Sequence, residues 1–181
     1  MGGNINKVLA RALVLAKPSK RSQVHLSTVS TAPLVPPFTS RTAHAKVKLA
    51  QDLWNTKNPQ KIKDAYTTDC IWRNRDIFIQ GHDGIVSMLS KKWQRETNYK
   101  LRKELFAFTD NKIAVQFWYE FKHWQTGRWF RCYGLEDWTF DEEGKMQKRQ
   151  MSGNDVPITE NERWFAKGVD VNTVDISEAH W

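Results

Sequence analysis

The N-terminal part of this chain lacks acidic residues. No aspartate or glutamate precedes Asp52, whereas eight lysines and arginines do, and the formal net charge of the whole chain is +8. The other twenty basic residues therefore balance all twenty acidic ones. The excess of positive charge lies in a leader, and the body that follows it is neutral overall. We therefore use the leader to predict cellular location and binding partners, and the body to predict chemical function.

Several residue patterns that define common enzyme classes are also absent. The two cysteines, Cys70 and Cys132, have no histidine or cysteine neighbour at metal-ligand spacing, so we expect reduced thiols and no metal site. The five histidines do not cluster, and the chain has no Ser-His-Asp pattern and no glycine-rich phosphate loop. Hydrolase, kinase and nucleotide-enzyme functions therefore lack support, and we expect no cofactor. The leader's apolar stretch is too short to span a bilayer.

The leader has the composition of an organelle transit peptide. Residues 6–17 combine apolar and basic side chains near helical spacing, Pro18 ends this stretch, and serines and threonines follow. A cationic amphipathic helix is attracted to an anionic membrane, so we predict a mitochondrial location, with the plastid as the alternative. A solvated tail without an address is the other interpretation. The basic residues available to a protein partner, an anionic lipid or rRNA are Lys7, Arg11, Lys17, Lys20 and Arg21.

The body has the length of one domain, which we place at residues 42–168, between the leader (1–41) and a tail (169–181). Apolar residues at helical spacing predict a helix over 42–56, and Asn58-Pro59 opens a short helix through residue 65. Residues 70–74 form a predicted short strand, and a helical stripe of apolar residues follows Gly81. Thr159 and Glu162 form a capping box for a short C-terminal helix.

From residue 99 onward the chain changes to the two-residue period of strands. Apolar and polar side chains alternate over 113–121, and turns at 110–111, 125–127 and 141–144 separate four predicted strands, the last of which ends at residue 152. Helices followed by an antiparallel meander define an α+β fold. The nine tryptophans and nine phenylalanines predict a core or a pocket that is rich in aromatic rings.

Short segments spread over residues 43–165 carry a family resemblance. They are 72–75 (WRNR), 92–93 (KW), 103–108 (KELFAF), 111–115 (NKIAV), 129–134 (WFRCYG) and 154–158 (NDVPI). These segments are similar to a SnoaL-like family of the nuclear-transport-factor-2-like superfamily, which also holds cyclases, ketosteroid isomerase and scytalone dehydratase. The resemblance implies helices packed on a strongly curved antiparallel or mixed sheet that forms a cone. After Phe165 the chain departs from the family's usual Trp-Pro and Gly-rich tail.

The resemblance also implies a ligand pocket inside the cone. Strand alternation would send Trp72 and Asn74 to one side and Arg73 and Arg75 to the other, where two guanidinium groups could bind a carboxylate or a phosphate. The alternative is that both arginines form structural salt bridges with nearby carboxylates. The carboxylates considered are Asp69, Asp76 and Glu136.

Other side chains are candidates for lining this pocket or for catalysis. The lining candidates are Phe117, Tyr119, Trp129, Arg131, Tyr133 and Asn154. For each aromatic residue the alternative is a place in the core. Asp155 follows the last long strand, and a carboxylate at the mouth of an apolar cone can act as a general base. Asp69 is a second candidate for this role, and either aspartate could instead only cap a turn or lie near a helix.

Two functions from different classes fit these observations. The one that we favour from the sequence is structural: an accessory subunit of a mitochondrial assembly, such as a respiratory complex, ATP synthase or mitoribosome, tethered by its leader. The alternative is a small-molecule enzyme of the isomerase, dehydratase or cyclase type that transfers a proton inside the cone. A homodimer through the open face of the sheet fits either function.

Overall fold

A computed structural model describes residues 33–181 as three α-helices, six strands and three short 3-10 turns. The leader residues Lys7, Arg11, Lys17, Lys20 and Arg21 lie outside this range. In chain order the elements are α1 (Ser40–Asn55), α2 (Pro59–Lys63), β1 (Tyr66–Asn74), β2 (Ile77–Gln80), α3 (Gly81–Arg95), β3 (Glu96–Phe108), β4 (Lys112–His123), β5 (Trp129–Phe140), β6 (Met146–Ile158), η1 (Glu160–Glu162), η2 (Val171–Thr173) and η3 (Glu178–His180).

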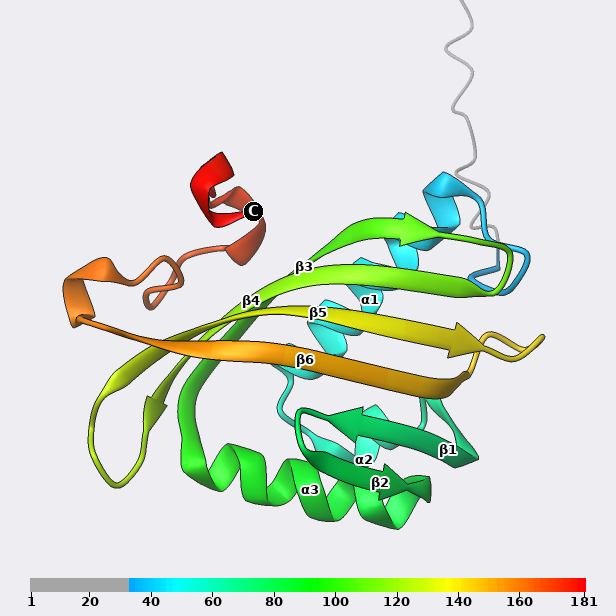
Figure 1. Ribbon diagram of the computed structural model, residues 1–181, viewed down its shortest axis with the longest axis horizontal. Helices are drawn as coiled ribbons and strands as arrows, with labels where there is room; N and C mark the ends of the chain where they lie inside the picture. The colour runs from blue at the N-terminus through cyan, green and yellow to red at the C-terminus, as the bar shows by residue number, and fades with distance from the viewer. Residues whose placement is uncertain (1–32) are drawn as a thin grey trace, which may run out of the picture. The chain divides into compact units, whose positions relative to one another are not determined.

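The six strands form one sheet in the order β2-β1-β6-β5-β4-β3. Neighbouring strands are antiparallel, except for β1 and β6, which are parallel. Figure 1 shows the curvature of this sheet, with α1 packed against β3 and α3 against β1. The predicted α+β class, with helices packed on a curved mixed sheet, is confirmed.

The first two helices begin at capping residues. Thr39 precedes α1, and its side chain accepts a hydrogen bond from the backbone N–H of Thr42, whose hydroxyl in turn accepts one from the Thr39 N–H. The helix therefore starts two residues before the predicted position. Asn58 caps α2 as predicted, and Pro59 occupies its first position. This helix ends at Lys63, two residues earlier than predicted.

Several strands extend beyond their predicted limits. β1 starts at Tyr66 instead of residue 70, β6 runs to Ile158 instead of 152, and β2 had no predicted counterpart. Pairing across the sheet accounts for this, because β6 is paired with β5 on one side and with β1 on the other. Thr159 forms its capping box with Glu162, but this box opens a single 3-10 turn rather than an α-helix.

The helices and the inner face of the sheet enclose an aromatic core. Trp54 of α1 stacks on Trp72 of β1 with ring centroids 5.8 Å apart, and the Arg149 guanidinium lies within 4.8 Å of both rings. Phe117 of β4 packs over Gly134 of β5, where an added Cβ would lie only 2.1 Å from a carbon of the phenyl ring. The absence of a side chain at Gly134 therefore lets Phe117 enter the core.

The C-terminal segment covers part of the other face of the sheet. Glu120 of β4 is fully buried there and accepts hydrogen bonds from the backbone N–H groups of Trp164 and Phe165, at 2.9 and 3.0 Å. The same carboxylate pairs with Arg131 of β5 at 2.7 Å. Phe165 belongs to a second apolar cluster, which includes Trp118. One buried carboxylate thus anchors the chain where it leaves the sheet.

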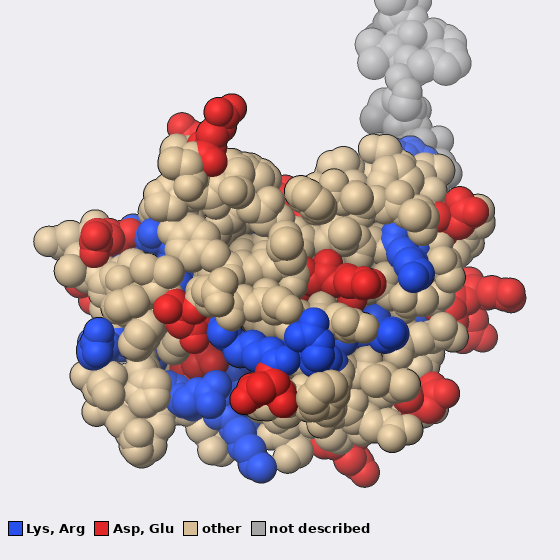
Figure 2. Space-filling model, in the orientation of Figure 1, with Lys and Arg blue, Asp and Glu red and all other residues tan. Residues whose placement is uncertain are grey.

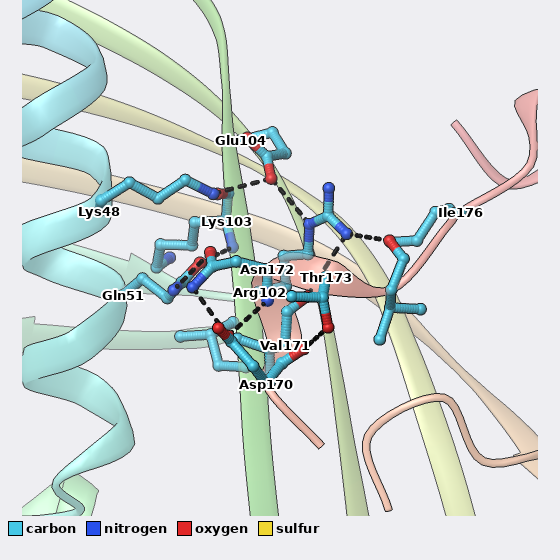
Figure 3. Close-up of polar contacts among 12 residues, drawn as sticks. Lys48, Gln51, Arg102, Lys103, Glu104, Asp170, Val171, Asn172, Thr173 and Ile176 are labelled. Atoms are coloured by element: carbon cyan, nitrogen blue, oxygen red, sulfur yellow. Dashed lines mark hydrogen bonds and ion pairs between the residues drawn. The ribbon is translucent and has the colours of Figure 1, made fainter.

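The tail that follows this anchor is held along β3 (Figure 3). Gln51 of α1 accepts a hydrogen bond from the Lys103 backbone N–H at 2.9 Å and donates one to the Asn172 side chain at 3.1 Å. Arg102 of β3 donates to the carbonyl oxygen of Val174. The tail, predicted as a segment separate from the domain, therefore packs against it.

Charged side chains of both signs lie on the face shown in Figure 2. Lysines and arginines gather in a band across its middle, with acidic side chains beside them. This mixture agrees with the balanced charge of the body. Within residues 33–181, the helices are too short or too polar to cross a membrane.

Candidate functional site

A pocket of about 720 Å³ lies between α3, the β1–β2 hairpin and parts of β4, β5 and β6. Its volume is in the range of small-molecule sites, which combine apolar walls with a few convergent polar groups. The apolar lining includes Ile77, Ile79, Met88, Phe121 and Phe130. The charged and polar lining includes Asn74, Arg75, Asp76, Lys91, Lys92, Arg95, Glu96, Tyr119, His123 and Asp155.

Arg75 connects three strands at one wall of this pocket. It lies just after the last residue of β1 and has a φ of 59°, in the left-handed region that residues other than glycine rarely adopt. Its Nη2 atom lies 2.5 Å from Asp155 Oδ1, 3.2 Å from the Tyr119 hydroxyl and 3.0 Å from Cys132 Sγ. Because these groups come from β6, β4 and β5, Arg75 fixes their side chains relative to one another.

The surroundings of Arg75 change the protonation equilibria of the groups at this wall. Burial alone would lower the pKa of the guanidinium, but Tyr119, Cys132 and Asp155 outweigh burial and raise it. Burial, with the Asp155 charge, raises the pKa of the Cys132 thiol to about 12. This thiol therefore stays protonated at neutral pH, which makes it a poor nucleophile. Cys70 is also buried, and both cysteines are free.

The expectation that Arg73 and Arg75 project to the same side is wrong. Arg73 obeys strand alternation, and its guanidinium donates to Ser152 Oγ at 3.2 Å, away from the pocket. Arg75 has left the strand, so alternation no longer sets its direction. The salt bridge that Arg75 forms is with Asp155, not with one of the three carboxylates considered from the sequence.

A buried ion pair forms the α3 side of the site. Lys92 and Glu96 are four residues apart, only 7% and 4% exposed, and joined by a short Nζ–Oε2 hydrogen bond. The Lys92 ammonium also lies 4.3 Å from the centroid of the Tyr119 ring. Burial lowers the pKa of Lys92, although the Glu96 carboxylate opposes this shift. This pair has no predicted role from the sequence, although its four-residue spacing at a helix end is a visible signal.

Tyr119 lies between the two ion pairs and keeps its proton. Burial, with the negative charge of Glu96 adding to it, raises the pKa of its hydroxyl well above the ordinary value. The hydroxyl oxygen accepts the hydrogen bond from Arg75, so its proton remains available to donate. The pocket wall therefore offers a neutral phenol beside the Asp155 carboxylate.

Asn74 lines the pocket and is oriented by a buried charge network. Arg149 Nη1 donates to Asn74 Oδ1 at 3.2 Å. An arginine side chain can only donate, so this contact identifies the atom that faces it as the amide oxygen. The amide nitrogen of Asn74 consequently points away from Arg149 Nη1.

Behind Asn74, two buried cations share one buried carboxylate. Glu136 lies 2.7 Å from Lys103 Nζ and 2.6 Å from Arg149 Nη2, and all three side chains are 3% exposed or less. Burial would raise the pKa of Glu136, but its two cationic partners, Arg149 and then Lys103, lower it to about 2. Lys103 shares that carboxylate with Arg149. The effect of burial on Lys103 therefore outweighs the attraction of Glu136, and the pKa of Lys103 falls to about 8.

The other predicted site residues lie outside this pocket. Trp72 and Phe117 are core residues, as the alternative interpretation held. Trp129, Arg131 and Tyr133 point to the opposite face of β5, where Arg131 binds Glu120. Asn154 and Asp69 are exposed and are not part of the lining. Of the twelve candidates, the structure therefore brings together Asn74, Arg75, Tyr119 and Asp155.

Among the residues that the structure describes, no group of three or more His, Cys, Asp or Glu side chains is arranged to hold a metal ion. The Arg75–Asp155 and Lys92–Glu96 pairs and Tyr119 are instead engaged in ion pairs and hydrogen bonds with protein groups. What they can provide to a bound molecule is hydrogen-bond donors and the carboxylate of Asp155, whose side chain is 34% exposed; the exposed Asp76 adds a second carboxylate to the lining.

Solved structures of low sequence identity share this architecture. SalBIII, an epoxide hydrolase/cyclase-like enzyme in pyran ring formation in polyether salinomycin, aligns with a TM-score of 0.56 at 12% identity, over 63% of this chain and 92% of SalBIII. NTF2-like proteins of unknown function from Exiguobacterium sp. 255-15 and Burkholderia pseudomallei K96243 align with TM-scores of 0.53 and 0.55, at 11% and 14% identity. Each alignment covers 61% of this chain, and 99% and 88% of the respective partner.

These alignments define the class by its fold: an NTF2-like arrangement of helices packed on a curved sheet. A search of curated proteins found no match. Residues 36–166 match the family described as "Protein of unknown function (DUF1348)", and the chain belongs to that family.

Proposed function

We propose that this protein is a small-molecule enzyme that transfers a proton within its pocket and needs no cofactor. The observation that supports this most is the convergence of one carboxylate and three donors on a single cavity. Asp155 comes from β6, Tyr119 from β4, Asn74 from β1 and Lys92 from α3. The fold relative SalBIII, an epoxide hydrolase/cyclase-like enzyme, lends support at the level of the fold.

In the proposed reaction Asp155 acts as the general base. It removes a proton from a carbon next to a substrate carbonyl, the electrons of the C–H bond form a C=C bond, and the carbonyl oxygen takes the negative charge. Tyr119 and Lys92 stabilise that oxygen as donors. The protonated Asp155 then returns the proton to another carbon in an isomerisation, or to a departing hydroxyl group, which leaves as water in a dehydration.

The geometry allows these groups to act on one molecule. Asp155 Oδ1 and the Tyr119 hydroxyl both accept hydrogen bonds from the same Arg75 nitrogen, so the two oxygens cannot lie further apart than the sum of those two distances. A substrate carbon and its carbonyl oxygen can therefore reach both groups at once. Arg75 is a positioning residue in this scheme, because it holds Asp155 in place.

Solvent deuterium exchange at the carbon next to the carbonyl, followed by NMR on a panel of ketones and keto acids, tests the proposal. We expect the wild-type protein to catalyse this exchange, and Asp155→Asn to slow it about a hundred-fold or more, as loss of a general base does. Tyr119→Phe should reduce the rate while leaving binding largely intact.

Asp69→Asn is a matched control, since Asp69 is exposed on β1 and outside the pocket. Exchange at the wild-type rate in Asp155→Asn would contradict the assignment of the base. A panel on which the wild-type protein shows no catalysed exchange would count against the enzyme proposal as a whole.

Residence in mitochondria, membership of a larger assembly and a homodimer through the sheet remain separate predictions. The first two depend on the leader, which lies outside residues 33–181. Blue-native electrophoresis of organelle extract, with the N-terminus of the native protein determined in parallel, tests them. Migration only as a small species, with an N-terminus near Ala43, would refute tethering by the leader.

A further inference from the structure

We propose that the substrate of this pocket is a small organic anion with an apolar body, of the keto-acid class. This inference rests on the proposed function and adds the charge of the substrate to it. Three features support it: the cationic α3 wall, the buried layer behind Asn74, and the apolar part of the lining.

The α3 wall carries three cations and one carboxylate. Lys91, Lys92 and Arg95 all line the pocket, and Lys91 and Arg95 are four residues apart on the same helix face. Lys92 and Arg95 both pair with Glu96, at its two carboxylate oxygens. Lys91 forms no ion pair with any residue from 33 to 181. This wall therefore has an excess of two positive charges.

Two features reduce this excess. The carbonyl groups at the C-terminus of α3 carry the equivalent of about half a negative charge. Asp76, in the turn between β1 and β2, adds one negative charge to the lining, whereas Arg75 and Asp155 neutralise each other. The lining keeps a small positive excess after both are counted.

The buried layer behind Asn74 adds a further positive charge. Lys103 and Arg149 share the single carboxylate of Glu136, and this unit contacts the pocket through the hydrogen bond from Arg149 to Asn74. An uncompensated buried cation is costly, and a nearby anion reduces that cost. A negatively charged ligand in the pocket supplies such an anion.

The apolar lining determines the rest of the ligand. Ile77 and Ile79 come from β2, Met88 from α3, and Phe121 and Phe130 from β4 and β5. These side chains form a surface for an alkyl or aryl group, whose burial supplies binding free energy. In the proposed binding mode the acid group faces Lys91 and Arg95, and the carbonyl faces Tyr119 and Asp155.

The test compares keto acids with their methyl esters, which share the carbonyl and the apolar part but lack the charge. Pyruvate and phenylpyruvate, each with its methyl ester, are titrated into the full-length protein by calorimetry, with deuterium exchange measured in parallel. We expect at least one acid to bind about ten-fold more tightly than its ester at low salt, and this preference to shrink as salt is added.

Two variants report on the α3 wall. Lys91→Gln combined with Arg95→Gln removes exposed charges, so the fold should persist, and we expect it to weaken the acid about ten-fold while leaving the ester unchanged. Lys61→Gln is the matched control, because Lys61 is an exposed lysine on α2, away from the pocket.

Each outcome distinguishes the two proposals. Esters that bind as well as acids and undergo catalysed exchange would overturn the anion proposal and leave the proposed function standing. Acids that bind preferentially, with loss of this preference in the double variant but without catalysed exchange, would support anion binding and count against the proton-transfer chemistry. Absence of binding by either acid, or an unchanged preference in the double variant, would overturn the anion proposal.

Discussion

Replacement of Glu136 by glutamine tests the charge network behind the pocket most directly. The change keeps the shape of the side chain but removes the charge that Lys103 Nζ and Arg149 Nη2 contact at 2.7 and 2.6 Å. The Trp138 indole N–H also donates to this carboxylate, at 2.6 Å. The variant therefore leaves two buried cations without a counter-charge.

The expected loss can be worked out from the pKa of Glu136. Its value falls from 4.5 to about 2 in the folded protein. At about 1.4 kcal/mol per pKa unit, this shift corresponds to roughly 3 kcal/mol of stability at neutral pH. Removal of one partner from a buried ion pair typically costs about 3–5 kcal/mol, which agrees. For a chain of this size the melting temperature should fall by about 6–12 °C.

The pH dependence provides a second and sharper criterion. Because the folded pKa is lower than the unfolded one, the stabilisation by Glu136 is complete above about pH 4.5 and is lost as the pH falls through about 2. Urea unfolding of both proteins should therefore show a large difference at pH 7 that narrows below pH 4.5. Other groups that titrate in acid contribute equally to the stability of both proteins, so their effects cancel in this comparison.

Glu142→Gln serves as the control, because Glu142 is exposed in the turn between β5 and β6. It should change stability by no more than about 0.5 kcal/mol. A loss below about 1 kcal/mol for Glu136→Gln at pH 7, or a difference that persists undiminished at pH 2, would refute the assignment of Glu136 as the buried counter-ion.

Three further predictions follow from single contacts. Lys103→Met should be at least as stable as the wild-type protein at pH 7. Because burial lowers the pKa of Lys103 to about 8, the wild-type protein should become more stable between pH 8 and 10.5, and the variant should lack this rise. Urea unfolding across that pH range measures both effects. Gly134→Ala should lower stability by about 1–3 kcal/mol in thermal unfolding, since its Cβ would clash with Phe117. Glu120→Gln should weaken the anchor at Trp164 and speed proteolysis of the C-terminal segment without loss of the sheet; equal protease resistance would argue against this anchor.

The three α-helices and the strands of the meander could be predicted from local patterns, whereas β2 could not. The Asn58-Pro59 start of α2 depends on neighbours in the sequence, and so does the alternation over β4 and β5. Strand limits were less predictable, because β1 and β6 extend where they pair with each other across a long separation in the chain. The resemblance to the superfamily supplied the cone, which the periodicity alone does not imply.

The candidate site could be predicted only in part. Strand alternation and a position near the mouth of the cone are enough to predict three of its residues, Asn74, Tyr119 and Asp155. The direction of Arg75 depends on its φ of 59° at the end of β1, which no residue pattern indicates. Lys92 and Glu96 had a visible spacing, but their burial depends on how α3 packs on the sheet.

By itself the sequence determined the α+β class and the neutral body behind a basic leader, because composition and period are local properties of the chain. The tertiary structure decided which charges meet. Lys103, Glu136 and Arg149 come from β3, β5 and β6, and only the strand order and register place them in one buried cluster. Coulombic interactions depend on distance in space, and that distance is set by the packing of segments that lie far apart in the chain.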